Sequence, residues 1–133
     1  MTRTKRNLLW ALGFLMMAVG VMHFVQPEPF MRIVPPPLPP RGAVYLSGVF
    51  EFLGGLGLLI PRTRRLAAWG LVALYVAVFP ANLYMAFQGI QLDPANPMPA
   101  WGAWARLPFQ AVFIAWAHWF TKPSGGPVPE PED

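Results

Sequence analysis

Apolar residues in this chain form four long blocks, which are separated by short segments rich in proline or arginine. The blocks cover residues 8–25, 43–60, 66–87 and 100–120. Each is long enough to cross a bilayer as a helix that rises about 1.5 Å per residue. The fourth is the least regular, because charged and polar residues and a proline interrupt it. We therefore predict an all-α domain over residues 1–121, a bundle of four transmembrane helices, and a disordered, acidic, proline-rich tail over residues 122–133.

Two of the connections between the blocks contain many prolines. The first reads Q-P-E-P-F-M-R-I-V-P-P-P-L-P-P-R-G over residues 26–42, and the second covers residues 88–99. Proline blocks a regular helix and favours extended backbone, so the first connection is predicted to be a stiff loop outside the bilayer. An alternative is a lid that docks over the mouth of the bundle, because its apolar side contains Phe30, Ile33, Val34 and Leu38.

Composition indicates an integral membrane protein. Hydrophobic residues make up 55% of the 133 residues and charged residues only 12%, against roughly a quarter in soluble domains. The basic residues lie at the ends of the blocks, where membrane topology accounts for them, so nucleic-acid binding is not expected. The lack of cysteine excludes disulfides and thiolate–metal chemistry within this chain. With two histidines and no dense acidic cluster, no metal site is predicted.

The basic residues also predict the orientation of the helices. With the N-terminus inside, seven basic residues lie on the inner side and three on the outer side. The inner ones are Arg3, Lys5, Arg6, Arg62, Arg64, Arg65 and Lys122, and the outer ones are Arg32, Arg41 and Arg106. By the positive-inside rule, both termini are therefore predicted to be cytoplasmic.

One carboxylate, that of Glu51, lies inside the second apolar block, about eight residues or ~12 Å from its outer end. A charged side chain at this depth is costly, so by default it marks a functional site with a partner. The other three blocks place polar residues in the same half of the bilayer. We predict a polar pocket there, and the candidate residues are His23, Glu51, Asn82, Arg106 and Gln110.

Structural roles are the alternatives for these residues, and the sequence leaves both kinds of role open. Glu51 is either a ligand or proton site, or one half of an ion pair, for example with Arg106, that fixes the register of two helices. Asn82 is also typical of hydrogen bonds between helices, and His23 of helix ends. Arg106 also has the length to reach the membrane surface.

Small residues accompany Glu51 on one side of the second block, at helical spacing. They let helices approach closely, so this side is predicted to face the bundle. In the third block, Pro80 lacks a backbone N–H and frees the carbonyl of Val76 for a neighbouring helix. The predicted structural residues are Ser47, Gly48, Gly54, Gly55, Pro80 and Pro108.

Several segments follow one another in a recognisable order and spacing, and they cover nearly the whole chain between its basic head and its tail. They are G-V-M-H-F at 20–24, P-E-P-F with the P-P-P-L-P-P loop, S-G-V-F-E-F-L-G-G-L-G-L-L-I-P at 47–61, R-R-L-A-A-W-G-L at 64–71, V-F-P-A-N-L-Y-M-A at 78–86, and R-L-P-F-Q with I-A-W-A-H-W at 106–119. Together they resemble the DoxX-like family of small bacterial four-helix membrane proteins. The resemblance implies a multi-pass protein of the bacterial cytoplasmic (inner) membrane. The positions that it marks are His23, Glu51, Pro80, Asn82, Arg106, Pro108 and Gln110.

Three functions are compatible with these observations, and whether the protein is an enzyme stays open. The first, which we favour, is a non-catalytic subunit or assembly factor of a membrane complex, as the resemblance implies for some relatives. The second is a quinone-linked redox or respiratory accessory protein, with a quinone as cofactor and Glu51 or His23 relaying protons. The third is a small proton-coupled transporter. The expected partners are the lipid bilayer and a membrane or redox protein, and the oligomeric state is open.

Overall fold

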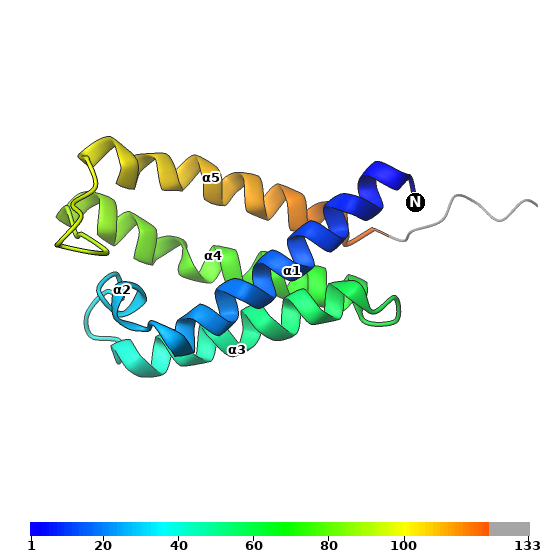
Figure 1. The fold of residues 1–133 in the computed structure, drawn as a ribbon, viewed down its shortest axis with the longest axis horizontal. Coiled ribbons are helices and arrows are strands. Elements are labelled where there is room, and N and C mark those ends of the chain that lie inside the picture. Colours follow the sequence, from blue (N-terminus) through cyan, green and yellow to red (C-terminus); the bar gives the residue numbers. More distant parts are fainter. Residues whose placement is uncertain (123–133) are drawn as a thin grey trace, which may run out of the picture.

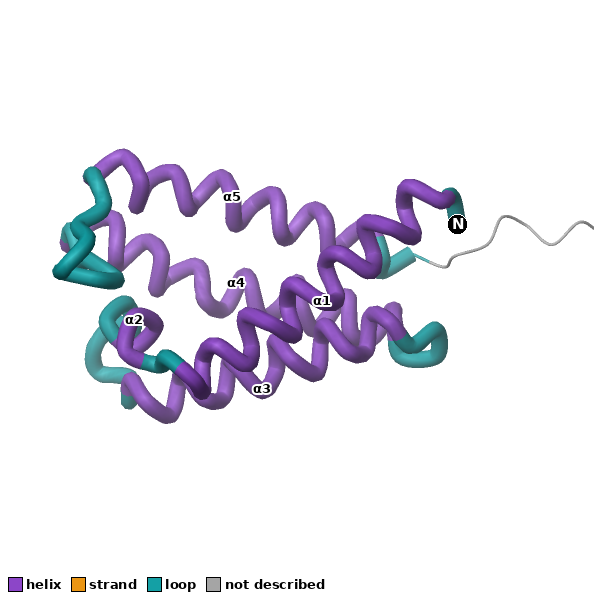
Figure 2. The backbone as a smooth tube through the Cα atoms, viewed as in Figure 1, coloured by secondary structure: helices purple, strands orange, loops and turns teal. Residues whose placement is uncertain are grey.

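Four long helices and one short helix make up residues 1–122, the part of the chain that the computed structural model describes. The long helices are α1 (Arg3–Val25), α3 (Pro40–Leu59), α4 (Arg64–Gln88) and α5 (Ala100–Trp119), and the short one is α2 (Glu28–Met31). Successive long helices run antiparallel (Figure 1), and every regular element in this part is a helix (Figure 2). The predicted all-α fold is confirmed for these residues. The tail was predicted over residues 122–133, and all of these except Lys122 lie outside the described part.

The helix boundaries follow from local signals at their ends. Helix α1 begins before the apolar block does, because the Thr2 hydroxyl accepts a hydrogen bond of 3.1 Å from the Lys5 N–H and caps the helix. Helix α3 has Pro40 in its first turn, where a missing N–H has no cost. Helix α4 ends at Gly89, whose φ of 63° is left-handed and suits glycine.

Helices α1, α3 and α4 are long and apolar enough to cross a membrane. Helix α5 has the same length as α3, but the polar residues and proline in its sequence make it less apolar. Large apolar side chains are exposed on all four long helices, as expected for surfaces that face lipid. Examples are Phe14, Leu53, Leu66 and Phe109. These three candidate spans indicate a membrane protein.

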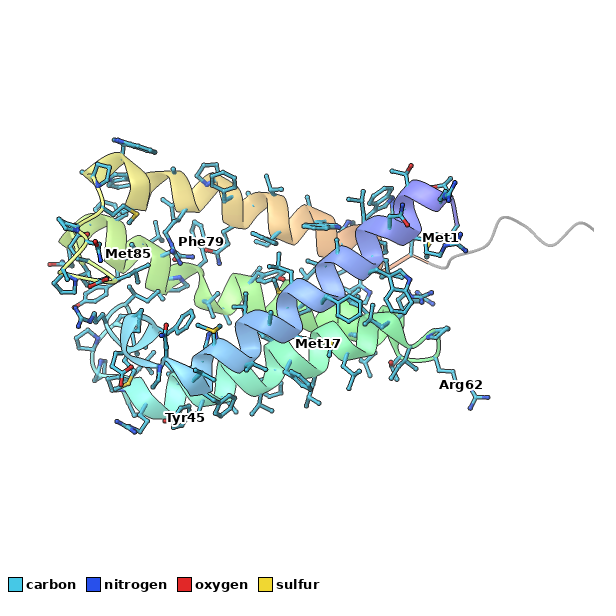
Figure 3. All side chains as sticks on the ribbon, viewed as in Figure 1. Met1, Met17, Tyr45, Arg62, Phe79 and Met85 are labelled. Carbon is cyan, nitrogen blue, oxygen red and sulfur yellow. The ribbon has the colours of Figure 1, made fainter. Side chains whose placement is uncertain are left out.

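The long helices pack in the order α1, α3, α4, α5. Helices α1 and α5 do not pack along their length, and they approach each other at one end of the bundle, where the ammonium of Lys5 lies 5.1 Å from the ring centre of Trp119. We call this the closed end; it holds Met1 and Arg62, and the opposite, open end holds Tyr45 and Met85 (Figure 3). The α1–α3 and α4–α5 pairs diverge toward the open end (Figure 1).

A core cluster of buried residues from all four long helices fills the bundle toward the closed end. Its members are Leu9, Leu12, Met16, Leu58, Ala68, Leu71, Tyr75, Ala117 and Phe120. Arginines also close this end, because Arg64 donates to the carbonyl of Leu58 at 2.8 Å and Arg65 donates to that of Thr121 at 2.9 Å. These bonds satisfy carbonyls near the ends of α3 and α5.

Glycines hold α1 and α3 in close contact. A Cβ atom on Gly55 would lie 2.5 Å from the carbonyl oxygen of Gly13, and one on Gly20 would lie 2.8 Å from that of Gly48. Each helix thus contributes two glycines seven residues apart. Gly54 instead faces α4, where a Cβ would lie 2.5 Å from Leu71. The small residues of α3 were predicted to share one face, but they divide between two neighbouring helices.

Candidate functional site

A cavity of about 550 Å³ lies at the open end, between the two helix pairs. Side chains from all four long helices and from the proline-rich loop line it, and most of them are apolar. The five residues predicted from the sequence as pocket candidates, His23, Glu51, Asn82, Arg106 and Gln110, all line this cavity. Ser47, Tyr75 and Pro80 line it as well, whereas Pro108 is exposed on α5 and does not. The structure therefore brings the predicted residues together, and their role as a ligand site stays a prediction.

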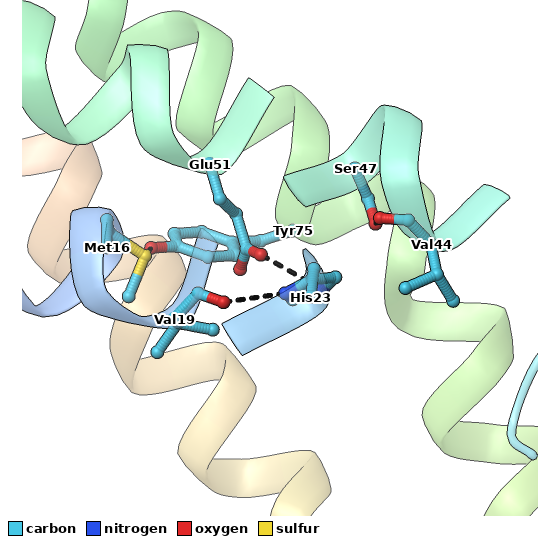
Figure 4. Close-up of polar contacts among 7 residues, drawn as sticks. All are labelled: Met16, Val19, His23, Val44, Ser47, Glu51 and Tyr75. Atoms are coloured by element: carbon cyan, nitrogen blue, oxygen red, sulfur yellow. Dashed lines mark hydrogen bonds and ion pairs between the residues drawn. The ribbon is translucent and has the colours of Figure 1, made fainter. Parts of the chain in front are cut away.

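His23 is held in place by its own helix and by α2. Its Nδ1 lies 2.7 Å from the carbonyl oxygen of Val19, one turn earlier in α1 (Figure 4). Its ring stacks on Phe30, with ring centres 3.9 Å apart and the planes 16° from parallel. The backbone carbonyl and the stacked ring fix the imidazole, so that Nε2 faces Glu51 on α3.

Glu51 is the partner of His23. Its Oε2 lies 3.2 Å from His23 Nε2, and the Glu51 side chain is 13% exposed (Figure 4). This oxygen is buried and has no hydrogen bond, because the contact is close enough for an ion pair but is not aligned with the ring N–H direction. A buried carboxyl oxygen with this unused capacity is a place where a ligand gains a hydrogen bond.

Tyr75 lies beside Glu51, on the side toward Met16 (Figure 4). It is buried on α4, and its hydroxyl donates to the sulfur of Met16 across the bundle (Figure 4). The contact separates the cavity from the core cluster of the closed end. Sequence analysis did not select Tyr75, although it lies seven residues before Asn82 and so shares its face of α4.

A second polar group lies on α4 and α5. Arg106 donates through Nε to Asn82 Oδ1 at 3.4 Å, Asn82 donates to Gln110 Oε1, and Gln110 donates to the carbonyl of Tyr75. The bonds run in one direction, from the guanidinium to a backbone oxygen. Pro80 was predicted to free the carbonyl of Val76 for a neighbouring helix, and this stays a prediction; the carbonyl that Gln110 uses is that of Tyr75, one residue earlier.

Glu51 and Arg106 do not form the ion pair that was one interpretation of the sequence. The charged partner of Glu51 is His23, and no carboxylate among residues 1–122 lies within 4.0 Å of Arg106. The two polar groups lie on different helix pairs and both line the cavity. The arrangement therefore presents a histidine–carboxyl pair from α1 and α3, and a guanidinium from α5.

The proline-rich loop covers the open end. Its prolines do not keep it extended throughout, because residues after Pro27 form α2. Phe30 stacks on His23, while Ile33 is buried in a second apolar cluster with Met85 and Ala103. The docked lid is thus the interpretation that the structure supports. It connects the two helix pairs where they diverge.

Ser47 and the glycines of α3 have structural surroundings. Ser47 donates to the carbonyl of Val44 at 3.0 Å, one turn earlier in the same helix. A Cβ atom on Gly48 would lie 2.7 Å from the Cβ of His23, so the glycine lets α1 bring His23 up to Glu51. The close approach of α1 and α3 therefore also brings His23 and Glu51 into contact.

Comparisons with known proteins give one match. A family model described as "Domain of unknown function (DUF8561)" matches residues 12–121, which include every residue of the cavity. No curated protein and no solved structure matches the chain.

Proposed function

The chain belongs to the DUF8561 family, and from the geometry of its cavity we propose that it is a membrane protein that binds a small amphiphilic molecule at its open end. The observation that carries this proposal is the cavity of about 550 Å³, with mostly apolar walls and a few polar groups that converge on it. Ligand sites of proteins have this size and this composition.

The proposal includes a topology. We propose α5 as a fourth transmembrane span, because it packs against α4 and exposes large apolar residues along its length, among them Trp101, Phe109 and Val112. Seven basic residues lie at or beside the helix ends of the closed end and three toward the open end. The closed end would then be cytoplasmic, with both termini, and the membrane would be the bacterial inner membrane that the DoxX-like resemblance implies.

The ligand reaches the cavity from the bilayer in this proposal. Leu15 on α1 and Phe109 on α5 both line the cavity and are exposed, at 39% and 64%. Because α1 and α5 do not pack along their length, the cavity opens between them. A lipid-soluble molecule can pass through this opening without crossing water. A quinone head group, whose carbonyls accept hydrogen bonds from Arg106, is one ligand of this kind.

The test is a pair of phenylalanine substitutions of the same size. Val78→Phe adds a ring to a residue that lines the cavity, and Val49→Phe adds one to an exposed position on the outer face of α3. Wild type and both variants are purified in lipid nanodiscs, and bound small molecules are identified by native mass spectrometry. We expect wild type and Val49→Phe to retain an amphiphile that Val78→Phe loses at unchanged thermal stability.

A different outcome contradicts the proposal. If wild-type protein retains no small molecule and none can be added back, or if Val78→Phe retains as much as Val49→Phe, the cavity is not a binding site. Thermal unfolding of each variant shows whether a loss of ligand is instead a loss of fold.

A second candidate is a subunit or assembly factor of a membrane complex, and the opening between α1 and α5 favours it. A transmembrane helix of a partner protein that packed between α1 and α5 would cover the exposed side chains of Leu15 and Phe109. Stoichiometric co-purification of a second membrane protein, lost when Phe109 is replaced by tryptophan, supports this candidate. Retention of a small molecule by the isolated chain supports the first.

A further inference from the structure

The charges around the cavity indicate what kind of head group it holds. Four of the lining side chains are titratable: His23, Glu51, Tyr75 and Arg106. They come from α1, α3, α4 and α5, so each long helix contributes one. Their hydrogen bonds determine their protonation, and together they set the net charge that a ligand meets.

The His23–Glu51 pair is neutral as a unit. A carbonyl oxygen only accepts hydrogen bonds, so the contact of 2.7 Å with Val19 places a proton on Nδ1 of His23. The other ring nitrogen, Nε2, lies 3.2 Å from Oε2 of Glu51. A neutral imidazole beside an ionised carboxylate would leave a buried charge without a counter-charge, so the pair carries one further proton. Whether His23 or Glu51 holds that proton, their charges add to zero.

Arg106 is therefore the uncompensated charge among the described residues of the cavity. Tyr75 is neutral, because its hydroxyl keeps its proton and donates it to Met16. Asn82 and Gln110 pass the hydrogen bonds of Arg106 on to a backbone carbonyl and supply no negative charge. Arg106 uses Nε for this chain, so the terminal nitrogens of its guanidinium keep their donors for a ligand.

We propose that the cavity binds an amphiphile whose head group has a single negative charge, held by the terminal guanidinium nitrogens of Arg106. This inference rests on the proposed function and adds the class of ligand. One uncompensated positive charge favours a monoanion, and the apolar surroundings strengthen the attraction because their dielectric constant is low. The apolar walls contact the hydrocarbon part. A fatty carboxylate and a lipid with a monoanionic phosphate share this chemistry.

The test uses the full chain in nanodiscs of zwitterionic phosphatidylcholine, with palmitate labelled isotopically at its carboxyl carbon. We expect a carboxyl resonance for protein-bound palmitate that differs from that of palmitate in the lipid. Methyl palmitate and hexadecylamine have the same chain length with a neutral and a positive head, and we expect both to compete about tenfold more weakly or worse. Lysophosphatidylglycerol tests the phosphate source: stronger competition than palmitate supports the monoanion and identifies a phosphate head.

Substitutions locate the charge that is responsible. Arg106→Gln is expected to lower the palmitate affinity about tenfold or more and to leave that of methyl palmitate unchanged, while Arg106→Lys keeps most of the affinity. Arg41→Gln is the matched control, because Arg41 is exposed on α3 toward the open end and does not line the cavity. We expect it to bind palmitate as wild type does.

Three results would overturn the inference. They are equal competition by palmitate and its methyl ester, an unchanged palmitate affinity in Arg106→Gln, and tighter binding of a neutral short-chain ubiquinone than of palmitate. Each leaves the proposed function standing, because an amphiphile still binds. Binding of none of these probes overturns both. The ligand series uses wild-type protein, so it tests the preference for a negative head group even if an Arg106 variant does not fold.

Discussion

The closed end and the open end are built from the same four long helices, but different groups fill the space between them. At the closed end, leucines such as Leu12, Leu58 and Leu71 are fully buried and pack against one another. At the open end the helix pairs diverge around a cavity, whose mostly apolar walls include the polar side chains of Glu51, Asn82 and Gln110. The bundle therefore has one closely packed end and one end with a cavity that polar side chains help to line.

The polar side chains of the open end find hydrogen-bond partners inside the protein. His23 bonds to the carbonyl of Val19 in its own helix, and Gln110 on α5 bonds to the carbonyl of Tyr75 on the neighbouring helix α4. Backbone carbonyls thus satisfy side chains that would otherwise be costly in lipid. The closed end, with its continuous apolar core, holds the helices in register while the open end keeps its cavity.

The largest expected effect is at the closed end. Leu58→Ala removes a fully buried side chain, and we expect the free energy of unfolding to fall by about 2–5 kcal/mol. Leu53→Ala on the same helix is the control, because Leu53 is 55% exposed, and should change it by about 0.5 kcal/mol at most. Denaturation in mixed micelles measures both. Equal effects of the two variants would show that the closed end is not the packed core.

The next effect concerns the contact between α1 and α3. Gly55→Ala places a Cβ atom 2.5 Å from the carbonyl oxygen of Gly13 and 2.9 Å from the amide of Met17, and backbone atoms cannot turn away. We expect a loss of about 1–3 kcal/mol in the same assay. Gly70→Ala is the matched control, since nothing lies within 4 Å of its Cβ, and should be neutral or stabilise by up to about 1 kcal/mol. A Gly55→Ala protein as stable as wild type would contradict the glycine contact.

A smaller effect is expected at the open end. Glu51→Gln keeps the shape of the side chain, and its amide can donate to Nε2 of His23. Because the His23–Glu51 pair is already neutral, we expect the stability to change by no more than about 1 kcal/mol. Palmitate binding should persist in the variant. A loss of several kcal/mol would instead mean that Glu51 holds the bundle together and that the open end is structural.

The smallest effect lies in the loop between α4 and α5. The side chain of Asn96, and then the N–H of Ala95, donate to Asp93 and lower its pKa below the usual value. A carboxylate with a lowered pKa stabilises the folded loop above its unfolded pKa, about 3.9, and loses this contribution as pH falls through the folded pKa. Asn96→Ala should raise the pKa of Asp93, as measured by NMR titration. No change would show that the loop hydrogen bonds are absent in solution.

Much of the site was predictable from residue positions along the helices. His23, Glu51, Asn82 and Gln110 fall at similar depths once the antiparallel order of the blocks is known, and the structure places them around one cavity. Depth depends only on the rise of a helix and on where the helix begins, so it follows from the sequence.

The pairing within the site was not predictable in the same way. Whether Glu51 meets His23 or Arg106 depends on how each helix is rotated about its axis, and close glycine contacts set that rotation. Gly54 was assigned to the face of Gly55 and contacts another helix for the same reason. The proline content predicted the conformation of the loop only in part. It does not reveal that Ile33 packs in an apolar cluster with residues of α4 and α5.

Thiol reactivity at two single cysteines tests the difference between the two ends most directly, because the chain contains no cysteine of its own. Ser47→Cys replaces a side chain that lines the cavity, and Ala68→Cys replaces one that is fully buried toward the closed end. With a membrane-permeant maleimide in nanodiscs, we expect Ser47→Cys to react, palmitate to slow that reaction, and Ala68→Cys to stay unreacted until the protein unfolds. Equal reactivity at the two positions, with no protection by palmitate, would contradict a ligand-binding cavity at the open end.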